Sequence, residues 1–265
     1  MGAPSPQDKD FPWWLVALGV FGLYALWQVW TDDLYRQILG TLGRGVVITI
    51  VVTLVGFAMA ATMGLGLALM SLSRSLVLRQ GARLWIEVVR GLPMIVLLLY
   101  IAFVFAPGLV AGYNWLATWV GLDVIRTRDF PLLYRAVIAL AIGYSAFIAE
   151  VFRAGLQSVD PGQIEAADAL GLSRWNRFRH VVFPQAIRTI LPPLGNDFVA
   201  MVKDSSLVSV LGVLDVTQLG KVIAASNFRY FETYNVVALI YLTMTVTLSL
   251  LLRRLERHLR QGQRR

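Results

Sequence analysis

Long apolar runs recur along most of the chain, separated by short polar stretches. A helix needs roughly 20 apolar residues to cross a membrane, and six runs are candidates. They predict transmembrane helices at about 11–30, 45–70, 92–105, 132–151, 189–214 and 234–252, with polar connections that include 31–44, 71–90 and 220–233. Pro107-Gly108 is expected to end the third helix. The aromatic stretch 113–120 is too short to cross, so we place it at the membrane interface.

The first apolar run could be a cleavable signal peptide or a retained helix. A signal peptide begins with a basic segment and ends at small residues. Here Asp8 and Asp10 flank the single Lys9, and residues 27–32 contain no such cleavage site. We therefore interpret 11–30 as a transmembrane helix that follows a short polar tail.

The composition agrees with an all-α integral membrane protein. Hydrophobic residues make up 57% of the chain and charged residues only 15%, with a mean hydropathy of +0.64. The net charge of +8 could suggest nucleic acid, but lysine and arginine gather beside residues 150–190 and in the C-terminal tail. Basic residues mark cytoplasmic loops, so we predict cytoplasmic N- and C-termini and no nucleic-acid partner.

Several kinds of chemistry are excluded or disfavoured by residue content. The chain has no cysteine, so it has neither disulfides nor thiolate metal sites. His180 and His258 both lie among arginines, which disfavours a histidine metal site. No G-x-x-x-x-G-K-[ST] phosphate loop is present. Any ATP must therefore be bound by another chain, and we expect no cofactor on this one.

Residues 160–184, here called the polar hairpin, contain the start and stop signals of two short helices. Asp160 is suited to an N-cap and Pro161 to the first helical position. Gly171 can adopt the left-handed conformation that closes this helix. Ser173 can cap a second helix, and Pro184 prevents its hydrogen-bond ladder from continuing unbroken. An apolar stripe follows the second helix: Trp175, Phe178, Val181 and Val182.

The spacing in this hairpin resembles a known family. Three residues separate Glu165-Ala166-Ala167 from Gly171, and Phe183-Pro184 closes the segment, which is similar to the EAA loop of ABC-importer permeases. The flanks resemble the permeases for histidine, glutamate, glutamine, arginine and opines. The flanking segments are Glu150, Arg153 and Gly155 before the hairpin, and Pro184-Gln185-Ala186, Leu191-Pro192-Pro193 and Lys203-Asp204-Ser205-Ser206-Leu207 after it.

The resemblance covers roughly 41–255 and implies a type I ABC-importer permease fold. The family core has five transmembrane helices, so 1–40 would be a tail with one additional helix and 256–265 a basic cytoplasmic tail. It implies a second permease chain, identical or related, two ATPase subunits that bind ATP and Mg²⁺, and an extracytoplasmic binding protein. The residues expected to couple to the ATPase are Glu165, Ala166, Ala167, Gly171, Arg174, Phe178 and Pro184.

Charged residues inside the fifth predicted helix are candidates for substrate binding. An ionised group near mid-membrane costs about 2.5–3.5 kcal/mol on insertion scales. Asp197 and Asp204 are seven residues apart and share a helix face, whereas Lys203 points about 100° away. Lys203 could bind an α-carboxylate, Asp204 an α-ammonium and Asp197 a side chain, with Ser205 as an added donor. Alternatively, Lys203 extends towards water and the acids bond between helices.

The resulting prediction is a bacterial inner-membrane permease subunit that translocates polar amino acids and is not itself an enzyme. Three alternatives remain open at this stage. The chain could serve an ABC importer for another small polar solute. It could be an ion-coupled carrier or channel that uses Asp197 and Asp204, or a membrane scaffold that recruits a cytosolic partner.

Overall fold

The computed structural model describes residues 13–261, and this part of the chain is helical with no strand. The predicted polar tail 1–10 and residues 262–265 lie outside the described range. The first half contains α1 (Trp13–Thr31), α2 (Asp33–Ser71), α3 (Leu76–Gly91), α4 (Met94–Tyr100), the π-helix η2 (Ile101–Phe105), α5 (Ala106–Val120) and the 3₁₀ turn η3 (Thr127–Asp129). The second half contains α6 (Leu132–Gln157), α7 (Pro161–Ala169), α8 (Arg174–Arg177), the π-helix η4 (Phe178–Val182), α9 (Phe183–Asp204), the 3₁₀-helix η5 (Ser205–Leu211), α10 (Val216–Asn227) and α11 (Tyr230–Gln261).

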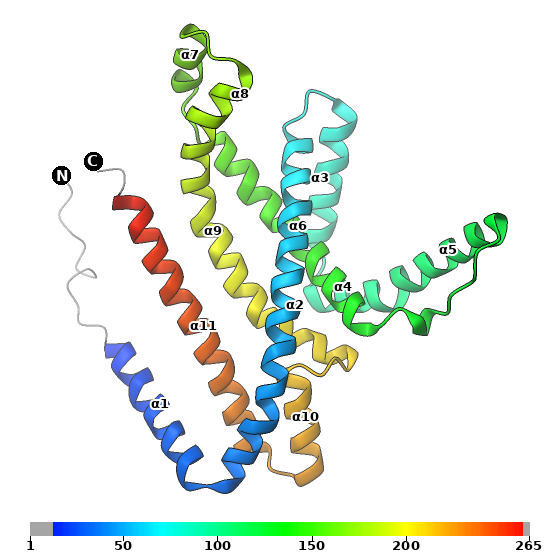
Figure 1. The fold of residues 1–265 in the computed structure, drawn as a ribbon, viewed down its shortest axis with the longest axis vertical. Coiled ribbons are helices and arrows are strands. Elements are labelled where there is room, and N and C mark those ends of the chain that lie inside the picture. Colours follow the sequence, from blue (N-terminus) through cyan, green and yellow to red (C-terminus); the bar gives the residue numbers. More distant parts are fainter. Residues whose placement is uncertain (1–12, 262–265) are drawn as a thin grey trace.

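The long helices α2 and α6 form the centre of the bundle, with α9 beside them (Figure 1). Small residues on α2 are buried at every fourth position: Gly56, Ala60, Gly64 and Ala68. A Cβ on Gly64 would lie 2.8 Å from Cγ2 of Ile148 on α6, so the two backbones approach closely. The close packing predicted from small residues is confirmed for this face, whereas Gly66 faces open space.

Two predicted polar connections are wrong because they are amphipathic helices. In 71–90, α3 buries Ala82, Ile86 and Val89 at helical spacing and leaves its arginines on other faces. In 220–233, α10 buries Gly220 and Ala224 four residues apart. The connection 31–44 is also helical from Asp33 onwards, with Asp32 as N-cap, so the predicted domain boundary at 40/41 falls inside α2.

The third predicted transmembrane helix does not end at Pro107-Gly108. It runs from Met94 through η2 to Val120, so the separation of 113–120 as a different segment is wrong. Pro107 lies at the start of α5, directly after the π-turn, where the regular ladder is already interrupted. In Figure 1, α5 projects sideways from the bundle.

Within the described residues, four helices are long and apolar enough to cross a membrane, in α2, α4–α5, α6 and α11. A fifth is obtained if the bent pair 174–211 and 216–227 counts as one span. The count of six therefore stays a prediction. The short helices α7 and α8 lie at the same end of the molecule as the C-terminal end of α11 (Figure 1).

Candidate functional site

The polar hairpin folds as its capping residues predict. The Asp160 side chain accepts a hydrogen bond from the Gly162 amide at 2.7 Å and begins α7. Gly171 has φ +72°, and the Leu172 amide donates to the Ala167 carbonyl, which closes the helix. Ser173 Oγ accepts from the Asn176 amide at 3.3 Å and begins α8. All of these signals are local, which explains why the sequence shows them.

An exposed aromatic group covers the second half of the hairpin. Trp175 stacks on Phe178, with ring centroids 6.0 Å apart, and Phe178 contacts Phe183. Trp175 remains 64% exposed, and Leu170 in the turn is 80% exposed. Of the predicted coupling residues, Glu165, Ala166, Gly171, Arg174 and Phe178 are exposed, Pro184 is half-buried and Ala167 is buried. The hairpin therefore presents an apolar surface that residues 13–261 do not cover.

The base of the hairpin packs closely against α6 and α9. Val159, Ala186 and Ile190 form a buried cluster, and a Cβ on Gly155 would lie 2.2 Å from Cγ1 of Ile190. Asp168 on α7 forms an ion pair with Arg177 at the end of α8. That pair was not predicted, because no helical spacing relates residues nine apart across a turn.

Two further details connect the hairpin to the bundle. The predicted ion pair between Glu150 and Arg153 at the end of α6 is confirmed. The ladder before Pro184 is broken by the π-helix η4, and α8 then continues into α9 without a loop. A displacement of the hairpin would therefore act directly on both α6 and α9.

A cavity of about 260 Å³ lies between α3, α4, α6 and α9, and we call it the acidic cavity. Its walls are mostly apolar, and its ionisable groups are Asp197, Asp204 and Tyr144; the remaining lining residues are Val89, Leu92, Met94, Leu97, Gly143, Phe147 and Ala200. The structure thus confirms that Asp197 and Asp204 share a face of α9. Mostly apolar walls with a few placed polar groups are typical of small-molecule sites.

The two carboxylates in this cavity have different surroundings. The Tyr144 hydroxyl donates to Asp204 Oδ2 at 2.8 Å, from α6 to α9. Asp197 Oδ2 is buried and has no hydrogen-bond partner. The guanidinium of Arg90 lies over the ring of Phe147, which lines the cavity, 5.7 Å from the ring centroid. The sequence did not indicate Tyr144, because 60 residues separate it from Asp204.

Lys203 and Ser205 do not line the acidic cavity. Lys203 is exposed on another side of α9. Ser205 is buried, and its Oγ donates to the Val202 carbonyl at 2.7 Å, so its donor is used within the chain. The α-helix does end at Asp204, where the chain tightens into η5. The four predicted substrate residues are therefore brought together only in part.

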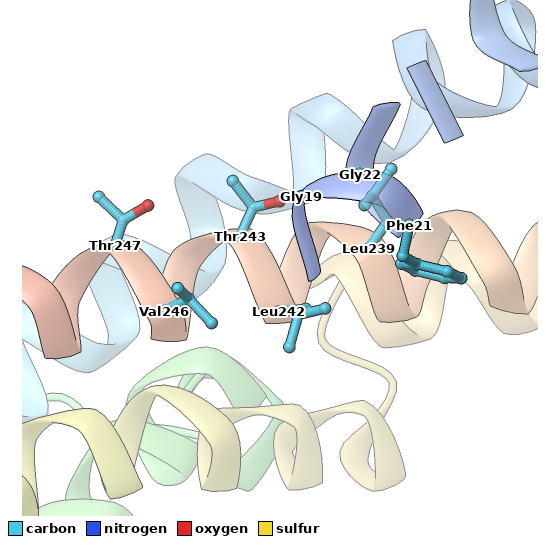
Figure 2. A pocket seen from close by; sticks show the side chains of 8 residues that line it. All are labelled: Gly19, Phe21, Gly22, Leu239, Leu242, Thr243, Val246 and Thr247. Atoms are coloured by element: carbon cyan, nitrogen blue, oxygen red, sulfur yellow. The ribbon is translucent and has the colours of Figure 1, made fainter. Parts of the chain in front are cut away.

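Two further cavities among the described residues have no charged lining residue. Figure 2 shows one of about 280 Å³ in which Gly19, Phe21 and Gly22 of α1 face α11, including Thr243 and Thr247. None of the described residues that line it is ionisable. A larger apolar groove between α2, α9 and α11 is also free of charged lining residues. The described part of the chain has no group of three or more His, Asp or Glu side chains placed to hold a metal ion.

Comparison with known proteins now identifies the family. Residues 60–265 match the model of the binding-protein-dependent transport system inner membrane component. The chain belongs to this family. It is 40% identical over 179 residues to the glutamine transport system permease protein GlnP of Escherichia coli, covering 68% of this chain and 74% of the relative. It is 35% identical over 211 residues to the probable amino-acid permease protein YxeN of Bacillus subtilis, covering 80% and 88%.

Solved structures give the same fold. An amino acid ABC transporter crystallised with histidines is 39% identical, with a TM-score of 0.68 over 83% of this chain and 94% of that one. The MetNI methionine ABC transporter, at 20% identity and a TM-score of 0.64 over 84% of this chain and 98% of that one, supports the fold alone. The chain is thus a multi-pass inner-membrane permease of the type I ABC fold, a transport subunit related to amino-acid permeases.

Proposed function

We propose that this chain is the membrane-spanning subunit of an importer that moves polar amino acids across the bacterial inner membrane. Two such permease chains, or this chain and a related one, would line the path, with six helices each and cytoplasmic termini. An external binding protein would deliver the amino acid. Two separate ATPase subunits would bind ATP and Mg²⁺. The observation behind this proposal is the polar hairpin, whose aromatic surface is left exposed by the described part of the chain.

The hairpin is suited to transmit force from an ATPase. It is rigid at its base through Gly155 and Ile190, and its turn is fixed by Gly171. Exposed aromatic side chains are typical anchors of protein interfaces. When the ATPases close on ATP, the hairpins of both permeases would approach each other and move α6 and α9. Hydrolysis would then return the helices to the starting position.

The acidic cavity is the proposed contact with the amino acid. Asp204 would bind the α-ammonium, and Asp197 would accept a hydrogen bond from the substrate side chain. The unpartnered Oδ2 of Asp197 supports this role, since a buried acceptor without a donor is costly. Lys203, on the exposed side of α9, would bind the α-carboxylate from the path between the two permease chains.

Proteoliposomes test this function. The permease would be reconstituted with its ATPase and binding protein, and uptake of labelled glutamine, histidine, arginine and glutamate measured with and without internal ATP. We expect saturable uptake of at least one of these that requires ATP. Uptake that persists without ATP and collapses with an ionophore would instead identify an ion-coupled carrier using Asp197 and Asp204. No flux of any amino acid would contradict the proposal.

A further inference from the structure

Asp204 lies at the C-terminal end of its helix, where few neighbouring residues of that helix can hold its side chain. It is the last residue of α9, and the following residues form the tighter η5 helix. Of the described side chains, Tyr144 is the one that holds Asp204, through the 2.8 Å bond to Oδ2. Tyr144 is only 5% exposed and packs with Ala60, Ile148 and Met201 in the core. A rigid tyrosine therefore fixes a carboxylate at a helix end.

We propose that Tyr144 is a positioning residue that orients Asp204 for the substrate ammonium. This inference rests on the proposed function, in which Asp204 contacts the amino acid. With Oδ2 bonded to Tyr144, rotation of the carboxylate is restricted and Oδ1 is left for a ligand in the cavity. A hydrogen bond from a neutral hydroxyl to a carboxylate is charge-assisted and directional. Binding to a group already held in place loses less conformational entropy.

The Tyr144–Asp204 hydrogen bond also joins α6 and α9, the two helices connected by the polar hairpin. Tyr144 belongs to α6, which leads into the hairpin, and Asp204 belongs to α9, which leads out of it. A relative shift of α6 and α9 would stretch the bond and turn Asp204. Tyr144 therefore makes the affinity of the cavity depend on the position of the hairpin.

The test is the Tyr144→Phe variant, which removes one hydroxyl and keeps the ring. Tyr241→Phe is the matched control, because the Tyr241 hydroxyl also donates to a carboxylate, that of Asp215, outside the cavity. Each variant would be purified with its ATPase in nanodiscs without the binding protein. Binding of labelled glutamine, histidine, arginine and glutamate would be measured, together with the thermal unfolding midpoint and retention of the ATPase.

We expect Tyr144→Phe to raise the Kd of the best-bound amino acid by about tenfold, as for loss of one bond to a charged group. Its unfolding midpoint and ATPase retention should match those of the unchanged complex. Tyr241→Phe should lower the midpoint and leave the Kd unchanged. In a chain that also carries Asp204→Ala, Tyr144→Phe should have no further effect on the Kd, because nothing is left to position.

Three results would overturn the inference. These are an unchanged Kd in Tyr144→Phe, an additive effect in the Asp204→Ala background, or loss of the assembled complex in Tyr144→Phe alone, which would make the tyrosine structural. If an amino acid binds the unchanged complex and one of these occurs, only this inference fails. If none of the four amino acids binds the unchanged complex, the proposed function fails and this inference with it.

Discussion

Two tyrosine–aspartate pairs in the same membrane domain have the same chemistry and different surroundings. Asp215 is fully buried, caps α10 by accepting from the Gln218 amide at 2.8 Å, and accepts from the Tyr241 hydroxyl at 3.0 Å. Asp204 is bonded by Tyr144 but opens into a cavity. Both oxygens of the first carboxylate accept hydrogen bonds within the chain, whereas of the second only Oδ2 accepts one from a described side chain.

The closed pair is the structural one. The backbone of Asp215 and Val216 lies so close to α2 that a Cβ on Gly45 would be 2.6 Å from the Val216 nitrogen. Thr217 on α10 also bonds the Tyr241 hydroxyl at 3.1 Å. The pair thus holds α10 between α2 and α11. The comparison gives a criterion that the following predictions test: a buried acid inside a membrane marks a functional site when its oxygens are not all bonded within the chain.

The strongest prediction separates the two acids by their effect on substrate. Asp204→Ala should weaken amino-acid binding by about 3 kcal/mol, roughly 100-fold, because the ammonium would lose its carboxylate partner. The unfolding midpoint should change little, since the side chain borders an open cavity. Equilibrium binding to the complex in nanodiscs measures the loss. Unchanged binding would show that the open carboxylate is not a substrate ligand.

The opposite behaviour is expected at the closed pair. Asp215→Ala should destabilise the fold by about 2 to 3 kcal/mol, because it leaves the Tyr241 hydroxyl and the Gln218 amide without their acceptor. Thermal unfolding in detergent checks this. Molecules that still fold should bind amino acid as before. If Asp215→Ala reduces affinity without reducing stability, the division between structural and functional pairs is wrong.

The third prediction concerns the polar hairpin, which should affect coupling to the ATPase and not substrate affinity. Gly171→Val places a branched side chain at φ +72°, at a local cost of about 1 to 2 kcal/mol. We expect less ATPase to be retained on purification and less ATP-driven uptake. Gly171→Asn is the control, because asparagine tolerates this conformation better. Unchanged ATP-driven uptake in Gly171→Val would show that the hairpin does not couple the ATPase to transport.

The smallest effect is expected at Asp197. Asp197→Asn keeps the size of the side chain and removes its charge, so the preference among amino acids should change more than the affinity for all of them. We expect a change in selectivity of about tenfold, or 1.4 kcal/mol, in competition uptake with histidine, arginine and glutamine. An equal loss of affinity for every amino acid would show that Asp197 does not contact the substrate side chain.

The features predicted correctly from sequence are those set within a few residues. The caps at Asp160 and Ser173 and the turn at Gly171 depend on local conformation, and the shared face of Asp197 and Asp204 follows from helix geometry. The family resemblance came from the same stretch. Membership is now established by the match over residues 60–265.

The incorrect predictions concern helices that contain many polar residues or a proline. The amphipathic helices α3 and α10 were interpreted as polar connections because charged and polar residues interrupt their apolar positions. Pro107 was expected to end a helix, but the π-turn before it removes the conflict. Tyr144 and Arg177 were missed because their partners are brought near by the fold and by the hairpin turn. Such contacts have no signal in a single sequence.

A cryo-electron microscopy map of the assembled importer with its amino acid bound tests the account most directly. We expect ligand density in the acidic cavity, with the α-ammonium against Asp204 and the Tyr144 hydroxyl still bonded to the same carboxylate. Density confined to the cavity between α1 and α11, or to a site that does not touch Asp204, would contradict this assignment.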